Sequence, residues 1–190
     1  MINLVKGQKI NIGKTKFTVG LGWIPNQGSG QTCDLDCSLF MLNDAKQIPS
    51  EKNFIFYNNK VSPDGAVTHT GDDRTGANSA GSDDEQIIID ATKIDPTVKE
   101  LIFIVTIHDA VAKQQNFGQV KDSYIRIIDT ETQEVIAKFD LNEDYSVETS
   151  VEFGRIYQKD GEWKFDASGI GYRENLDHFV SKYYSGEVVK

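Results

Sequence analysis

The chain has 190 residues, of which 38% are hydrophobic and 10% aromatic, enough to bury a core within one domain covering residues 1–190. Its 20 basic against 29 acidic residues give a formal net charge of -9, and no cluster of lysines and arginines offers a nucleic-acid footprint. Because no apolar run is long enough to span a membrane and residues 1–7 lack the apolar segment of a signal peptide, we expect a cytoplasmic protein without direct membrane insertion.

The N-terminal half is typical of short strands separated by turns. Alternating or briefly apolar stretches predict strands at residues 17–23, 35–42, 54–57, 67–70 and 86–89. In residues 35–42 the strand period places Leu35, Cys37, Leu39 and Met41 on one face. Residues 62–65 combine proline and glycine in the order that favours a turn.

The C-terminal half continues this pattern and ends in a helix. Residues 101–108 are the most apolar run and predict a central strand that is covered on both faces. Two hairpins are expected, at 124–128 with 135–141 and at 151–158 with 162–167. A short helical piece is expected at 109–115, and an amphipathic helix begins after Asn175, with apolar residues at helical spacing: Leu176, Phe179, Val180 and Tyr183. We predict a mainly β fold, a two-sheet antiparallel β-sandwich with a short C-terminal helix.

Acidic residues concentrate in one polar, glycine-containing part of the chain. Residues 64–90 contain one basic residue, Arg74, and seven acidic residues: Asp64, Asp72, Asp73, Asp83, Asp84, Glu85 and Asp90. Neighbouring carboxylates repel one another, and a hard cation relieves the repulsion. Calcium suits such loops because it accepts many oxygen ligands in irregular geometry. The alternative is an acidic loop that is simply solvated.

A second acidic pair stands at the start of the strand predicted at 35–42. The strand period points Asp34 and Asp36 to the same face, about 7 Å apart, where they can hold calcium or remain a solvated strand end. Asn58 and Asn59 can add amide oxygens or belong to an ordinary turn. The EF-hand pattern is not met, so a calcium site here would be assembled from separated loops.

The sequence gives less support to a disulfide, a zinc site or a catalytic site. Cys33 and Cys37 lie four residues apart in an expected strand, about 13 Å between Cα atoms, which is beyond disulfide reach. His108 and Asp109 invite a catalytic reading, but no nucleophile motif accompanies them. We expect His108 to be a hydrogen-bonded polar group under a loop and Asp109 to cap the next segment or to add a metal ligand.

Taken in order, these motifs resemble the TerD family of tellurium-resistance and general stress proteins. The resemblance covers nearly the whole chain and rests on residues 19–23, 34–38, 54–59, 67–72, 83–85, 105–110, 117–120 and 161–165. It implies a β-sandwich with one or two calcium ions bound by acidic loops, no known enzymatic activity, and partners among other stress-operon proteins. The metal positions implied by the resemblance are Asp34, Asp36, Asp72, Asp83, Asp84 and Glu85, with Asn58 or Asn59 as additional candidates.

Some positions depart from the family pattern. Asp73 stands where asparagine is more usual, Cys37 replaces a small apolar residue, and residues 77–80 are less acidic than the family loop. The leading hypothesis is a non-enzymatic calcium-binding stress protein acting as an adaptor or sensor, since metal binding can order a loop and create a surface for a partner. A calcium-dependent carbohydrate-binding module, with Tyr57 or Trp23 as the aromatic contact, is the alternative. A hydrolase with a metal-activated water is a third class.

Overall fold

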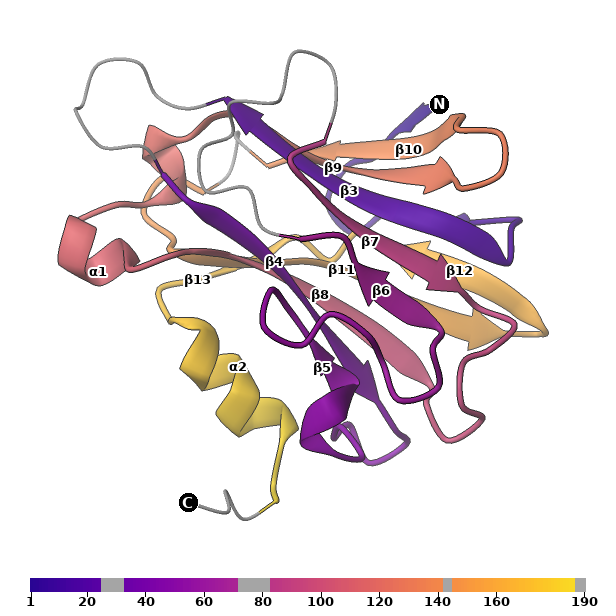
Figure 1. The fold of residues 1–190 in the computed structure, drawn as a ribbon. Helices are drawn as coiled ribbons and strands as arrows, with labels where there is room; N and C mark the ends of the chain where they lie inside the picture. Colours follow the sequence, from indigo (N-terminus) through magenta and orange to yellow (C-terminus); the bar gives the residue numbers. More distant parts are fainter. Residues whose placement is uncertain (25–32, 72–82, 142–144, 187–190) are drawn as a thin grey trace.

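The strands form two sheets that pack face to face as a β-sandwich (Figure 1). The computed structural model describes residues 1–24, 33–71, 83–141 and 145–186. Within each sheet the pairing is antiparallel, apart from the short parallel pair β1–β10. This architecture, with a short C-terminal helix, confirms the predicted fold class.

The first sheet, sheet A, has the order β1–β10–β9–β3–β7–β6. Its strands are β1 (Ile2–Asn3), β10 (Val135–Asp140), β9 (Lys121–Asp129), β3 (Lys16–Ile24), β7 (Glu85–Asp90) and β6 (Val67–His69). The second sheet, sheet B, has the order β2–β12–β11–β8–β4–β5, and β13 also pairs with β11. Its strands are β2 (Lys9–Asn11), β12 (Glu162–Asp166), β11 (Ser150–Lys159), β8 (Glu100–Ile107), β4 (Leu35–Leu42), β5 (Phe54–Ile55) and β13 (Ile170–Tyr172).

The main core lies between the sheets. Leu35, Cys37, Leu39 and Met41 of β4 all belong to it, which confirms the alternation expected from the sequence. The strand β8 is central in sheet B and every one of its residues is buried, as predicted for the most apolar run.

A second core covers the outer face of sheet B. Here Phe40 and Ile104 pack under Phe179 and Tyr183 of α2 (Leu176–Tyr183). The helix begins after Asn175, whose side chain accepts a hydrogen bond from the backbone N–H of His178, so the predicted cap is confirmed. The remaining helical pieces are short: α1 (Ala110–Lys113), η1 (Glu51–Asn53) and η2 (Phe117–Gln119).

The two ends of the sandwich carry different elements. At one end β3 and β8 finish while β4 and β7 begin, because Leu21 pairs with Glu85 and Leu35 pairs with Ile107 (Figure 1, upper left). We call this the acidic end. At the opposite end β8 and β12 begin and β7 finishes.

Cys33 and Cys37 are both buried, and neither forms a disulfide in the structure. None of the helices in the described part of the chain is long and apolar enough to cross a membrane.

Candidate metal centre at the acidic end

Asp36 is buried on the outer face of sheet B, at the start of β4. Its side chain is largely covered, and its Oδ2 lies 3.7 Å from Nδ1 of His108. The backbone N–H of His108 donates to the carbonyl of Asp34 at 2.8 Å, which aligns the end of β8 with the start of β4. The other ring nitrogen of His108 lies 3.4 Å from Oδ2 of Asp109. His108 therefore stands between two carboxylates, and at 44% side-chain exposure it is more open than a group covered by a loop.

The backbone of Asp109 has a left-handed conformation, with φ of 56°. It occupies the N-cap position of α1, as expected, but its side chain makes no capping hydrogen bond. The position therefore marks a sharp turn between β8 and α1.

Asp83, Asp84 and Glu85 are consecutive, yet their side chains point in three directions. Asp83 lies on the outer face of sheet A, where its carboxylate pairs with Arg126 Nε at 2.7 Å and accepts a hydrogen bond from the Gln86 amide at 3.0 Å. The Tyr124 hydroxyl donates to it at 3.3 Å. Burial raises the pKa of Tyr124, and the charge of Asp83 raises it further.

Glycine in β3 makes room for the Asp83 carboxylate. A Cβ built at Gly20 would lie 2.0 Å from Asp83 Oδ2, and one at Gly22 would lie 2.5 Å from the Tyr124 ring. Two glycines in a strand indicate a close approach by another group. The group at Gly20 is a carboxylate whose charge Arg126 already neutralises.

Asp84 is fixed to the end of β3. Its Oδ2 accepts the backbone N–H of Trp23 at 3.0 Å, and its own N–H donates to the carbonyl of Leu21 at 2.8 Å. The indole of Trp23 is fully buried and donates to the carbonyl of Cys33 at 3.1 Å. Trp23 thus ties the segment that carries Asp34 to the strand that holds Asp84, and its burial leaves no aromatic face for a carbohydrate.

Glu85 points inward and joins the two sheets. Its Oε2 accepts the backbone N–H of Cys37 at 2.8 Å, while Nε2 of His69 lies 3.2 Å from the carbonyl of Cys37. Since Nδ1 of His69 accepts the N–H of Gly71 at 3.1 Å, Nε2 carries the proton and donates. We call Glu85, His69 and the backbone of Cys37 the inter-sheet clamp. Burial, followed by the charge of Glu85, raises the pKa of the Cys37 thiol.

The remaining predicted ligands are less informative. Asn59 uses its side-chain amide to donate to the carbonyls of Phe54 at 2.6 Å and Lys52 at 3.2 Å, which shapes the turn after β5. Asn58 in the same turn is exposed. Asp72 lies outside the described residues.

The described carboxylates fit a hard cation better than a soft one. Within residues 1–24, 33–71, 83–141 and 145–186, no group of three or more His, Cys, Asp and Glu is arranged to hold a metal. Three carboxylates nevertheless belong to the acidic end of the sandwich: Asp34 directly precedes β4, Asp36 lies in β4 and Asp84 directly precedes β7. One carboxylate oxygen each of Asp34 and Asp84 is buried. Buried carboxylate oxygens suit calcium rather than zinc. The ligand set itself remains a prediction.

Comparison with solved structures places the fold in a known class. A crystal structure described as a homologue of a telluride resistance protein (TerD) from Streptomyces coelicolor A3(2) superimposes with a TM-score of 0.72 at 18% identity, covering 87% of this chain and 95% of the other. At this identity the likeness is one of fold.

Sequence comparison gives the family. The TerD domain model matches residues 1–183. A relative named general stress protein 16U, from Bacillus subtilis (strain 168), is 42% identical over 188 residues, covering 96% of each chain. The tellurium resistance protein TerD of Serratia marcescens is also 42% identical, over 187 residues and 96% of each chain. The chain belongs to the TerD family, and the two relatives described above are named as a general stress protein and a tellurium resistance protein.

Proposed function

We propose that this chain is a calcium-binding stress-response protein that acts as an adaptor or sensor in a larger assembly. The observation that carries the proposal is the placement of Asp34, Asp36 and Asp84 where strands of both sheets begin, with carboxylate oxygens shielded from water. Burying a charged carboxylate is unfavourable unless a cation or hydrogen bonds compensate it. A bound calcium ion would add positive charge next to these carboxylates.

The three carboxylates of residues 83–85 take different parts in this proposal. Asp84 is the ligand candidate, because its position next to Trp23 keeps it at the acidic end. Asp83 and Glu85 act as supports: the first is held by Arg126 and the second fastens sheet A to sheet B through Cys37. They position the loop ends around the ion without occupying its coordination sphere.

The supports also connect the metal site to the rest of the sandwich. In the inter-sheet clamp, Glu85 directly follows Asp84 and Cys37 directly follows Asp36. A displacement of either aspartate on binding calcium would therefore be transmitted to the contact between the sheets. Calcium binding would then alter the surface at the acidic end, and a partner that recognises this surface would respond to calcium, as expected for an adaptor or sensor. This role involves ion binding and no catalysed reaction, and we propose that the protein is not an enzyme.

Thermal unfolding of chelator-stripped protein tests the proposal. A ligand that binds only the folded state stabilises it by about 2.7 kcal/mol at a hundredfold excess over Kd, which corresponds to a Tm increase of about 5–11 °C for a chain of this size. Magnesium at the same concentration should give a much smaller increase, because it requires compact octahedral geometry. A melting curve that calcium leaves unchanged would overturn the metal proposal.

A further inference from the structure

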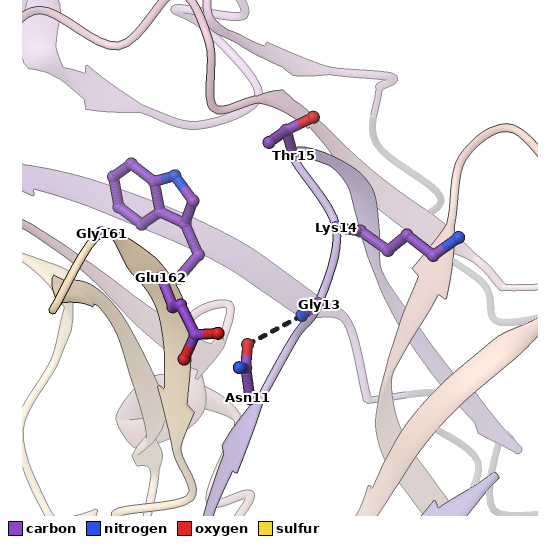
Figure 2. A pocket seen from close by; sticks show the side chains of 7 residues that line it. Asn11, Gly13, Lys14, Thr15, Gly161 and Glu162 are labelled. Atoms are coloured by element: carbon purple, nitrogen blue, oxygen red, sulfur yellow. Dashed lines mark hydrogen bonds between the residues drawn. The ribbon is translucent and has the colours of Figure 1, made fainter.

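Two hollows at the end of the sandwich opposite the acidic end share one wall, the side chain of Trp163. The first has a volume of about 350 Å³ and is bordered by Asn11, Thr15 and Glu162 (Figure 2). The second has a volume of about 530 Å³ and includes Asp95 and Gln158. We call the two hollows together with Trp163 the Trp163 groove.

Trp163 is anchored before any ligand arrives. It is the second residue of β12, and its carbonyl accepts the backbone N–H of Ile12 at 2.9 Å. Its half-buried indole packs against the main core. An aromatic group that is already fixed loses little conformational entropy on binding, so its exposed surface is an effective contact for a ligand.

The polar groups of the first hollow combine a donor with an acceptor. The Asn11 Oδ1 accepts the N–H of Gly13 at 2.9 Å, which holds the amide in place (Figure 2). Its NH₂ group is the donor, and the exposed carboxylate of Glu162 is the acceptor. The Lys14 side chain points away from both groups (Figure 2). Its ammonium group lies 2.6 Å from Oδ2 of Asp129.

The second hollow is also mixed in character. Gln158 pairs with Trp163 across the hairpin and brings an amide with both donor and acceptor atoms. The ammonium group of Lys99 donates to the carbonyl of Pro96 at 2.6 Å, and Asp95 accepts hydrogen bonds from Thr97. Lys99 and Asp95 are thus engaged by the protein, and the other charged residue that lines this hollow is the exposed Asp44. This arrangement disfavours an anionic ligand.

An aromatic wall between hollows edged by donors and acceptors suits a sugar. A pyranose ring with equatorial hydroxyls presents C–H groups on its face and hydroxyls around its rim. The face would stack on the indole while the rim meets Asn11, Glu162 and Gln158. We propose that the Trp163 groove binds a neutral oligosaccharide of β-linked hexopyranose units without calcium. This site is separate from the proposed metal site.

Titration of the full chain with two probes, cellotetraose and the β-1,4-linked tetramer of N-acetylglucosamine, tests this proposal. The protein has two tryptophans, and Trp23 is fully buried, so a ligand-dependent fluorescence change reports on Trp163. We expect saturable binding of at least one probe, with equal affinity in chelator and in calcium. Sorbitol, which has hydroxyls but no ring, should not bind.

Variants then locate the site by calorimetry. Trp163→Ala should weaken binding at least tenfold, Trp163→Tyr less, and Glu162→Gln about threefold, while the distant Tyr57→Ala should bind like the wild type. Melting curves establish that each variant is folded, and Trp163→Tyr with Glu162→Gln keeps the test valid if Trp163→Ala is unstable. Failure of both probes to bind the wild type, binding that chelator abolishes, or unchanged affinity in folded Trp163 variants would overturn the proposal. None of these results would affect calcium binding at the acidic end.

Discussion

Gly20→Ala should disrupt the buried pairing of Asp83 with Arg126. The added Cβ would lie 2.0 Å from Asp83 Oδ2 and 2.3 Å from its Cγ, so the carboxylate must move. The Asp83 side chain is completely buried, and it lies 2.7 Å from Arg126. Losing an interaction with a charged group costs about 1.5–3 kcal/mol, and alanine recovers about 0.5–1 kcal/mol relative to glycine in a strand. We expect a net loss of about 1–2 kcal/mol, a Tm decrease of about 2–8 °C.

A double-mutant cycle identifies the cause of that loss. Chemical and thermal unfolding are measured in chelator, so that metal binding does not contribute. In an Asp83→Ala background the carboxylate is gone, and Gly20→Ala should be neutral or stabilising by up to about 1 kcal/mol. An equal loss in both backgrounds, or no loss in the wild type, would refute the assignment of Gly20 as the space for Asp83.

Two further predictions concern the inter-sheet clamp and the Lys14 ion pair. In the presence of chelator, Glu85→Ala should destabilise the protein by about 1–3 kcal/mol, because it leaves the buried N–H of Cys37 without its acceptor at 2.8 Å. Glu85→Gln should destabilise it less, and equal stability of the wild type and both variants in chemical unfolding would contradict the clamp. The Lys14 hydrogen bond lowers the pKa of Asp129 from 3.8 to about 2, so its stabilisation is complete above about pH 4 and is lost as the pH falls toward 2. Lys14→Ala should raise that pKa in a carboxyl NMR titration, whereas a wild-type value near 3.8 would contradict the pairing.

The longer elements of the fold could be predicted from local pattern. An apolar run predicted β8, and alternation of apolar and polar residues predicted β4. Apolar residues at helical spacing after Asn175 predicted α2. The strands β1, β2 and β13 have two or three residues, too few to show a period, and were not predicted. The equally short β5 and β6 were predicted because each begins a longer strand-like stretch, at residues 54–57 and 67–70. Partner strands define them: β2, for example, exists through its pairing with β12.

The acidic end was predictable in position but not in detail. Sequence adjacency suggested that Asp83, Asp84 and Glu85 act together, whereas their partners come from three other strands. Arg126 carried no signal of its role because it lies far from the acidic stretch in the chain. His69 lies within that stretch, but it is a single histidine without a ligand pattern around it, so its role in the inter-sheet clamp was not indicated either. The glycine pair in β3 was the one available indication of a close approach.

Calorimetric titration of calcium into chelator-stripped protein tests the central claim most directly, with matched aspartate-to-asparagine variants. Asp84→Asn removes the charge, while the side-chain oxygen of the asparagine can still accept the backbone N–H of Trp23. Asp160 in the far hairpin is the control, since asparagine tolerates its left-handed backbone, φ of 56°. We predict saturable calcium binding that Asp36→Asn and Asp84→Asn each weaken at least tenfold, about 1.4 kcal/mol, and that Asp160→Asn leaves unchanged. Absence of calcium binding, or equal weakening by all three substitutions, would contradict a defined site at the acidic end.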